Sequence, residues 1–308
     1  MAPSVTRRWR PGRQVDVATT LGTLRRGSGD PTTARTPDGA WWRTTRTPDG
    51  PATQVLRVDR AAADVVSQSW GPGADWVADG VPGLLGAGDD PAGFDPGDVE
   101  FLQRAWRRHG PGWRVPRTER ALEALVAAVI EQKVTGKEAW RTWRSLLRLA
   151  GEPAPGPAPA GMLVFPTPDR LRQINSWQWH QVGLEAVRVR SVVAAAVAAP
   201  AVEACASLPG PLARQRLQAL PGVGVWTAAE VAVRAFGDAD AVSYGDYHVA
   251  RDVVRAFTGR DDGTDADLAE VLAPYAGHRY RVQRMVELAG VRRERHGPRA
   301  VVRDYRRI

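Results

Sequence analysis

The chain has 308 residues, 43% of them hydrophobic and 25% charged, a balance typical of a soluble globular protein with room for two domains or one large one. Its net charge of +8 points to a polyanionic partner, nucleic acid first and an anionic membrane second. The single cysteine, Cys205, excludes an internal disulfide framework, a cysteine-based zinc site and a four-cysteine iron–sulfur cluster. The N-terminus lacks the apolar segment of a signal peptide, and no apolar run is long enough to cross a bilayer. We therefore expect a cytoplasmic protein.

The first part of the chain is rich in short segments of β-branched and aromatic residues separated by turns. Such segments favour strands, and they cover residues 15–24, 40–47 and 52–59. We predict a small antiparallel sheet from them, with residues 60–70 as a helix packed on the sheet. The Gly/Pro/Asp-rich residues 71–98 are expected to form a connection.

From about residue 97 the pattern is helical almost to the end. Residues 118–150 repeat apolar side chains at helical spacing and predict two helices that meet near Thr135-Gly136. After a Pro/Ala/Gly loop, Thr167 as N-cap and Pro168 at the first position predict the start of another helix. The series continues with residues 187–199, 211–220, 226–236, 247–257 and 279–289. The predicted fold class is α+β, with a sheet domain over residues 1–88 and a helical region over residues 89–308.

The segment "ALPGVGVWTA" predicts a tight hairpin over residues 220–224 between two helices. Pro221 stops the first helix, Gly222 and Gly224 allow positive φ, and Val223 can pack inward as a plug. The unpaired N–H groups at the start of the next helix suit a phosphate. An ordinary helix–helix corner is the alternative. The basic chain and the flanking helices favour contacts to the DNA backbone that do not depend on base sequence.

Asp246 precedes another predicted helix, where an aspartate alone is usually just an N-cap. It follows Gly224 by 22 residues, so one helix and a short loop can bring it back beside the hairpin. There a carboxylate can stabilise the positive charge that develops on the sugar when an N-glycosidic bond breaks, and can orient the attacking water. The helix N-terminus favours the ionised form.

With these residues the chain resembles the helix–hairpin–helix DNA glycosylase superfamily, and within it the bacterial 3-methyladenine DNA glycosylase II (AlkA-type) family. The matching segments, in order, are "TRTPDGPA", "ALEALVAAVIEQKVT", "LPGVGVWTA", "GDYHV" and "PYAGHRYR". The resemblance implies a cleft between two helical subdomains into which a damaged nucleotide is flipped. It implies a monofunctional glycosylase of base excision repair that hydrolyses the N-glycosidic bond of alkylated bases, with Asp246 as the catalytic residue.

The resemblance also assigns residues to the base and to the DNA. The implied substrate-binding residues are Trp226, Tyr247, Gln132, Glu230 and Tyr275. The implied DNA-binding residues are Gly222, Val223, Gly224, Val225, Thr227, Lys133 and Arg279. An alkylated purine is cationic, so stacking on Trp226 or Tyr247 would gain a cation–π contribution, with core packing as the alternative for both.

Trp226 stands where lyase-type members of the superfamily carry a catalytic lysine. An indole cannot form a Schiff base, so we expect no lyase activity. The only lysines in the chain, Lys133 and Lys137, lie far from Trp226 in the sequence.

Several positions depart from the family pattern. Lys133 sits where an aliphatic wedge usually fills the gap left by the flipped base, and it can instead reach a phosphate or the opposite base, or simply be solvated. Glu230 replaces an aromatic pocket residue, and it either attracts a cationic base or faces solvent. Tyr275 and His278 take places where tryptophans are common, and Gly277 replaces a proline. These changes bear on substrate range.

The expected partner is double-stranded DNA containing damaged bases, with no membrane and with the protein as a monomer. Histidines without ligand spacing predict no metal site and no cofactor, although the resemblance allows an alkali cation at the hairpin carbonyls. Residues 278–308 hold ten arginines against three acidic residues, and this tail either lies along DNA or is solvated. Two other readings stay open: a DNA-binding damage sensor that has lost catalysis, and a bifunctional glycosylase/lyase.

Overall fold

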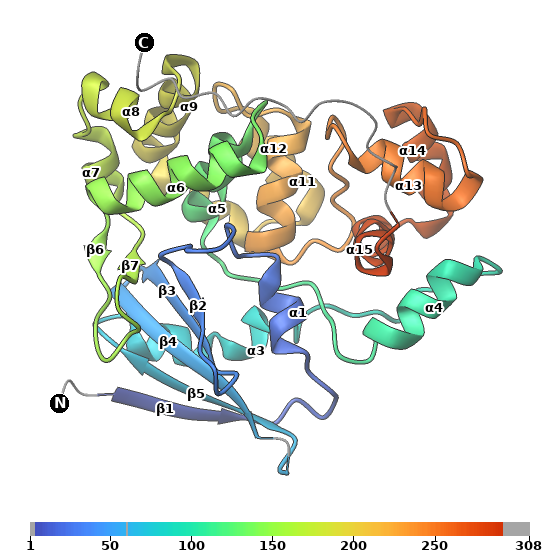
Figure 1. Cartoon of the computed structure of the whole chain (residues 1–308), viewed down its shortest axis with the longest axis horizontal. Helices are drawn as coiled ribbons and strands as arrows, with labels where there is room; N and C mark the ends of the chain where they lie inside the picture. Colours follow the sequence, from blue (N-terminus) through green and yellow to red (C-terminus); the bar gives the residue numbers. More distant parts are fainter. Residues whose placement is uncertain (1–3, 60, 292–308) are drawn as a thin grey trace.

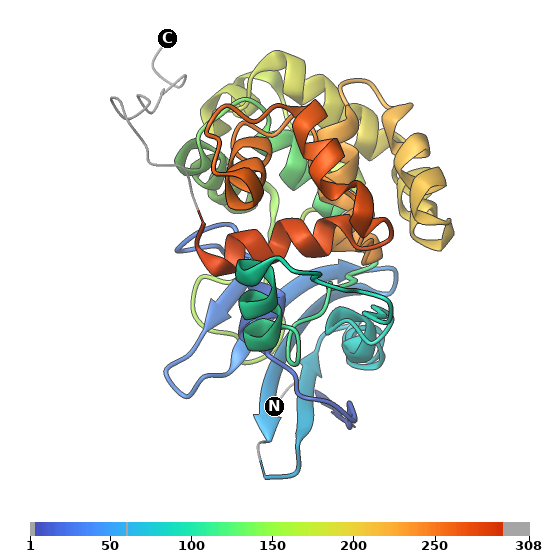
Figure 2. The ribbon, with the colours of Figure 1, turned by 90° about the vertical axis from the view of Figure 1, so that its right-hand side faces the viewer.

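The computed structural model describes residues 4–59 and 61–291. Its N-terminal part is a five-stranded antiparallel sheet with the strand order β1-β5-β4-β3-β2, which lies on one side of the helical region (Figures 1 and 2). The strands are β1 (Ser4–Trp9), β2 (Thr33–Arg35), β3 (Trp41–Thr47), β4 (Gly50–Asp59) and β5 (Asp64–Trp70). The predicted α+β class is confirmed.

Two elements of the first domain differ from the prediction. The segment predicted as the first strand contains helix α1 (Val17–Gly22), because Asp16 caps it by accepting hydrogen bonds from the Thr19 N–H and hydroxyl at 3.0 and 2.6 Å. The segment predicted as a helix is strand β5, which pairs with β1 on one side and β4 on the other. Its run of Val, Ser, Gln and Trp suits a buried strand better than a helix.

The helices that cover this sheet lie in the segment predicted to be a connection. They are α2 (Ala74–Asp79) and α3 (Val81–Leu84). The carbonyl of Val77 in α2 accepts a hydrogen bond of 2.6 Å from the Gln54 side chain in β4, which ties the helix to the sheet. The short length of both helices and the Gly/Pro content around them hid them from the sequence pattern.

The rest of the described chain is almost entirely helical. The helices are α4 (Glu100–His109), α5 (Ala121–Glu131), α6 (Gly136–Ala150), α7 (Pro168–Arg172), α8 (Ser176–Val182), α9 (Ala186–Val197), α10 (Ala199–Ala204), α11 (Gly210–Gln218), α12 (Val225–Val231), α13 (Val249–Thr258), α14 (Asp265–Leu272) and α15 (Arg279–Ala289). Short helical turns are η1 (Cys205–Ser207), η2 (Ala232–Phe236, a π-helix) and η3 (Ala273–Tyr275), and a two-stranded ribbon joins β6 (Glu152–Pro153) to β7 (Leu163–Val164).

The predicted helix boundaries at two caps are confirmed. Thr135 begins α6 through a capping box with Glu138. Thr167 caps α7 by accepting the Arg170 N–H, with Pro168 at the first position. The predicted Pro/Ala/Gly loop, in contrast, contains strand β6, which pairs with β7 just after the loop.

The helical region has two apolar cores, and α12 contributes to both. The first core lies among α5, α6, α9 and α11 and includes Ala228 and Val231 of α12. The second lies among α4, α13, α14 and α15 and includes Ala229. The run α12–η2 therefore lies between the two apolar cores, and the hairpin directly precedes it (Figure 1).

In the described part of the chain, no single helix is both long and apolar enough to cross a membrane; α9 and the α10–η1 segment reach that length only as a pair bent by 77°. The arginine-rich tail that was expected either to follow DNA or to be solvated falls, over residues 292–308, outside the described residues.

Candidate functional site

The predicted hairpin joins α11 to α12. The Val223 N–H donates to the Leu220 carbonyl at 3.1 Å, and the Val223 side chain is buried, as the plug prediction required. Gly222 has φ of 77°, and a Cβ there would lie 2.1 Å from Ser191 Oγ. Both its conformation and its surroundings therefore require glycine.

Gly224 differs from the prediction, because its φ is −94° and not positive. It is the N-cap of α12, and that position takes extended backbone. A Cβ added at Gly224 would meet no protein atom within 4 Å. Nothing inside the fold therefore requires glycine here, and its small size leaves the outer surface open beside Val225, whose side chain is 52% exposed.

Gln132 fastens the hairpin from outside. Its side-chain Nε2 donates to the Gly222 carbonyl at 2.9 Å and to Thr227 Oγ1 at 2.8 Å. The Thr227 side chain is buried, so only its backbone is left for the predicted DNA contact, which stays a prediction. Thr227 is the third residue of α12; its side chain faces the core, and its hydroxyl oxygen accepts the hydrogen bond from Gln132. The amide nitrogen of Gln132, predicted to bind the base, is committed to the hairpin.

Lys133 lies in the loop between α5 and α6 with φ of 53°, an uncommon left-handed conformation for a residue other than glycine. Arg188 of α9 holds this loop by donating to the carbonyls of Ile130 and Gln132 at 2.9 and 3.3 Å. The Lys133 side chain is exposed. Because its neighbour Gln132 touches Gly222, this lysine lies close to the hairpin despite its distance in sequence.

Asp246 binds both the start of α13 and Trp226. Its Oδ1 accepts the N–H groups of His248, the N-cap residue of α13, and of Val249 at 2.7 and 3.0 Å. Its Oδ2 accepts the Trp226 Nε1–H at 3.2 Å. The structure therefore brings the predicted carboxylate back to the helix that follows the hairpin, as the 22-residue separation suggested.

The two aromatic candidates differ in exposure. Trp226 is half-buried and packs against the first helical core. Tyr247 is 69% exposed, so core packing does not explain it. The Arg251 guanidinium lies 4.8 Å from the centre of the Tyr247 ring, and the His248 ring lies 4.9 Å from it edge-on. Arg251 and His248 thus hold an exposed ring beside Asp246.

Glu230 does not face solvent, as one of its two predicted roles required, because only 12% of its side chain is exposed. Its carboxylate accepts a hydrogen bond from Ser243 Oγ at 2.7 Å and pairs with Arg234 at 2.6 Å. Burial raises the pKa of Glu230, but Arg234 and the Ser243 hydrogen bond lower it by more, so the carboxylate is held below its ordinary pKa. Arg234 was not predicted as part of the site, although a glutamate followed four residues later by an arginine on a helix is a recognisable pair.

The segment around Tyr275 packs on the second helical core. The Tyr275 ring lies 6.3 and 6.0 Å from those of Phe94 and Phe257. Arg279 forms a bidentate ion pair with Asp240 at 2.8 and 2.5 Å. A base contact from Tyr275 and a DNA contact from Arg279 stay predictions.

The described residues contain no cluster of three His, Cys, Asp or Glu side chains that could hold a metal ion. The hairpin carbonyls of Leu220 and Gly222 already accept hydrogen bonds from Val223 N–H and the Gln132 amide. A carbonyl has a second lone pair, so these oxygens fit a weakly bound alkali cation without requiring one. That cation stays a prediction.

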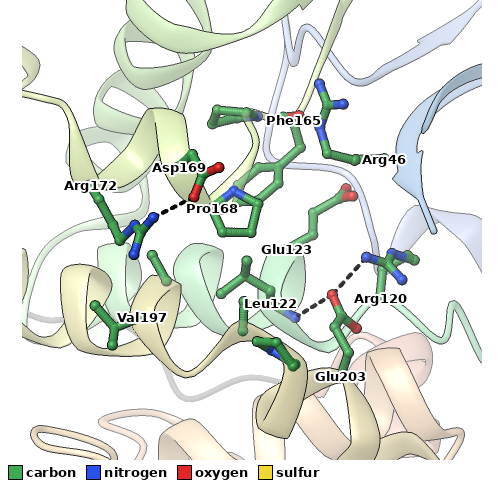
Figure 3. Close-up of a pocket in the computed structure, with 14 residues that line it drawn as sticks. Arg46, Arg120, Leu122, Glu123, Phe165, Pro168, Asp169, Arg172, Val197 and Glu203 are labelled. Carbon is green, nitrogen blue, oxygen red and sulfur yellow. Dashed lines mark hydrogen bonds and ion pairs between the residues drawn. The ribbon is translucent and has the colours of Figure 1, made fainter. Parts of the chain in front are cut away.

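A separate cavity of about 450 Å³ lies where the sheet meets the helices (Figure 3). Its lining comprises Arg46, Arg120, Leu122, Glu123, Phe165, Pro166, Pro168, Asp169, Arg172, Ala196, Val197, Ala199, Pro200 and Glu203. Each arginine in this lining pairs with a carboxylate: Arg46 with Glu152, Arg120 with Glu203 and Arg172 with Asp169. None of the predicted site residues lines this cavity, so we place the candidate site at the hairpin and Asp246.

The chain was compared with known proteins. No protein-family model matches it. It is 34% identical over 138 residues to a protein of Mycobacterium tuberculosis described as "Probable bifunctional transcriptional activator/DNA repair enzyme AlkA", a match covering 44% of this chain. The match covers 27% of that relative, so the chain spans about a quarter of its length.

Two solved structures share the fold over nearly the whole chain. The 3-methyladenine DNA glycosylase from Archaeoglobus fulgidus has a TM-score of 0.74 and 16% identity, covering 91% of this chain and 97% of that one. The 8-oxoguanine glycosylase/lyase of Clostridium acetobutylicum has a TM-score of 0.69 and 13% identity, covering 94% and 97%. With its five-stranded sheet, its helical region and its hairpin, the chain has the fold of these helix–hairpin–helix DNA glycosylase structures.

Proposed function

We propose that the protein is a DNA glycosylase of base excision repair that hydrolyses the N-glycosidic bond of alkylated bases in double-stranded DNA. The observation that carries this proposal is the contact between Trp226 and Asp246 at the end of the hairpin. An indole and a carboxylate, side by side at a phosphate-binding turn, match the two parts of a damaged nucleoside: the flat base and the sugar that becomes cationic. The names of the AlkA relative and of the Archaeoglobus enzyme support alkylated bases as the substrate class.

Asp246 acts on the sugar. The bond between C1′ and the base nitrogen breaks with its electron pair going to the base, so an alkylated purine leaves without its positive charge. The sugar is left as an oxocarbenium-like ion, which the Asp246 carboxylate stabilises. The same carboxylate orients a water for attack at C1′ and takes up its proton. Two backbone N–H groups and the Trp226 indole fix the carboxylate in place before the reaction.

Trp226 and Tyr247 receive the flipped base. A cationic purine stacked on an indole gains about 0.5–2 kcal/mol from the cation–π interaction, which an undamaged base lacks. Exposure of Tyr247 leaves its ring available for such stacking. Flipping requires the base to be unstacked, and a damaged base is the least costly to unstack.

The hairpin and Lys133 bind the DNA backbone. The start of α12 has no side-chain cap, so its N–H groups can donate to a phosphate. Val225 is exposed beside them, and the Lys133 charge lies on the adjacent loop. These contacts read no bases, so binding to undamaged DNA should be salt-dependent and independent of sequence.

We also propose that the enzyme lacks lyase activity, because the side chain that touches Asp246 after the hairpin is an indole and not an amine. Lys133 is the amine to test, since its loop contacts the hairpin. Borohydride should trap no covalent adduct with DNA. A trapped adduct that disappears in Lys133→Arg would contradict this part of the proposal.

The deciding experiment incubates the protein with methylated DNA and identifies the released bases. Asp246→Asn should lower release by at least about a thousandfold while DNA binding survives. Asp16→Asn is the matched control, because Asp16 also accepts an N–H group at the start of a helix but lies in the sheet domain. No release by the wild-type protein, with DNA binding intact, would favour the damage-sensor reading.

A further inference from the structure

Two side-chain hydrogen bonds join α12 to the loop that carries Asp246. The first is the Trp226–Asp246 bond described above. The second runs from Ser243 Oγ to Glu230 Oε1 at 2.7 Å. Trp226 and Glu230 lie one helical turn apart on α12, and Ser243 and Asp246 lie three residues apart in the loop. The two bonds therefore form parallel connections between the same pair of segments.

Ser243 is a fixed point of the loop. It is 1% exposed, and Gln283 of α15 holds it twice: Oε1 accepts the Ser243 N–H at 3.3 Å, and Nε2 donates to Ser243 Oγ at 3.2 Å. The Ser243 carbonyl accepts the Asp246 N–H at 3.2 Å. The position of Ser243 thus determines the position of the Asp246 backbone.

Glu230 is fixed from its other side. Its Oε2 accepts from Arg234 at 2.6 Å, and the Arg234 Nε donates to the Thr23 carbonyl in the sheet domain at 3.1 Å. An ionised carboxylate can only accept hydrogen bonds, and both oxygens of Glu230 already accept one, from Ser243 and from Arg234. A line of hydrogen bonds therefore runs from the sheet domain through Arg234, Glu230 and Ser243 to the Asp246 backbone.

The same loop has other contacts, and they reach other helices. Asp238 pairs with Arg214 of α11, Asp240 with Arg279 of α15, and the Gly245 N–H donates to Asp265 of α14. The side-chain hydrogen bonds described between this loop and α12 are those of Ser243 and Asp246. Ala241 and Val242 also share the second apolar core with Ala229 of α12, but such packing is not directional and does not orient a carboxylate.

We propose that Glu230 and Ser243 are positioning residues that hold Asp246 at its distance from Trp226. This inference rests on the proposed function, and it gives Glu230 a role behind the site in place of direct contact with the base. Loss of the connection leaves DNA binding intact but lets the carboxylate move away from the reacting sugar, which affects kcat and not KM.

The test measures base release from methylated DNA at saturating and limiting DNA concentrations. Ser243→Ala should lower kcat about tenfold with KM changed less than about twofold. Glu230→Gln keeps an oxygen that can accept from Ser243, so it should lower kcat only about threefold. In the double variant the two effects should not add, because both act on one hydrogen bond.

Glu203→Gln is the matched control, since Glu203 is also a partly buried glutamate paired with an arginine, at 2.8 Å from Arg120. It should leave kcat unchanged even where it alters stability. Hydrogen exchange measured over residues 243–249 gives a readout besides activity: exchange should rise in Ser243→Ala and not in Glu203→Gln.

The possible results separate the proposed function from this inference. No base release by wild type contradicts the proposed function, whereas the exchange measurement still tests the connection. An active wild type with unchanged kcat in both Ser243→Ala and Glu230→Gln overturns the inference. A rise in KM at constant kcat, or fully additive effects in the double variant, overturns it as well. Should Ser243→Ala not fold, Glu230→Gln and its exchange profile carry the test.

Discussion

The hairpin region and the cavity at the sheet–helix junction both contain a glutamate paired with an arginine, but they use the pair differently. In the cavity, Glu203 accepts from Arg120 and from the N–H groups of Ala121 and Leu122, so it caps α5 (Figure 3). In the hairpin region, Glu230 connects Arg234 to the loop of the candidate catalytic carboxylate. One pair completes a helix, and the other extends toward the site.

The difference shows why a cavity is a poor guide to the site when the proposed substrate is duplex DNA. The cavity encloses about 450 Å³, yet each of its arginines is already paired with a carboxylate. The hairpin leads into uncapped N–H groups and an exposed Val225 at the start of α12, and Tyr247 is exposed beside Asp246. A duplex is too large for a cavity and is recognised through its backbone, so an open face with unused donors suits it better.

The largest expected effect within the hairpin is on stability, from Gly222→Ala. The methyl group would clash with Ser191 and occupy a left-handed conformation, which should cost about 1–3 kcal/mol in the free energy of unfolding. Urea unfolding measures this cost. An unchanged midpoint would mean that the turn is not held as tightly as its contacts indicate.

Gly224→Ser, in contrast, should affect DNA binding and not lower stability. The serine meets no protein atom and can cap α12, so unfolding should be unchanged or harder by up to about 0.5 kcal/mol. DNA binding should weaken about tenfold, because the side chain covers donors intended for a phosphate. Fluorescence anisotropy with a duplex at fixed salt gives the affinity. If affinity is retained, the hairpin does not face DNA and the comparison with the cavity breaks down.

Lys133→Gly should have smaller effects, raising stability and weakening DNA binding. Glycine adopts φ of 53° without strain, so the free energy of unfolding should rise by up to about 1 kcal/mol. The slope of log K against log salt should fall by about one, since one phosphate contact is lost. Lys133→Arg keeps the charge and the strain and should leave both quantities unchanged. A salt slope unaffected by the glycine would assign this lysine to solvent.

The two glutamates should affect the pH dependence of stability in opposite directions. The pKa of Glu230 is lowered in the folded state, so its contribution is present above its ordinary pKa of 4.5 and is lost as pH falls through the lowered value. Burial raises the pKa of Glu203 despite Arg120, so its contribution is present below 4.5 and is lost as pH rises through the raised value.

Urea unfolding between about pH 3 and 7 separates these contributions. The difference between wild type and Glu230→Gln should grow with pH, and the difference between wild type and Glu203→Gln should shrink. If both differences changed with pH in the same direction, the pKa values of Glu230 and Glu203 would be shifted in the same direction, which contradicts this prediction.

The sequence predicted the features that depend on local chemistry. The helix boundary near Thr135, the Thr167 cap, the Val223 plug and the return of Asp246 to the hairpin all follow from residues close together in the chain. Two predictions in the sheet domain were wrong because local signals compete there. The β-branched segment predicted as a strand forms α1, since Asp16 caps it. The segment predicted as a helix from its leading alanines forms β5, since it pairs with strands on both sides.

Features that join distant segments could not be predicted. Nothing in the sequence indicates that Gln132 reaches Gly222, or that Ser243 reaches Glu230, because each pair meets only when several helices pack. The extended conformation of Gly224 was missed for a related reason: glycine is compatible with many conformations, and its role as an N-cap is decided by the helix that follows.

The scarcity of lysine has a practical consequence for this protein. Its only two lysines, Lys133 and Lys137, lie in the loop beside the hairpin and at the start of α6. A reagent that acylates amines therefore modifies one edge of the folded molecule and, apart from the chain terminus, no other side chain. Mass spectrometry of the modified peptide would then report occupancy of the hairpin by DNA as a single protection signal, without labels or engineered residues.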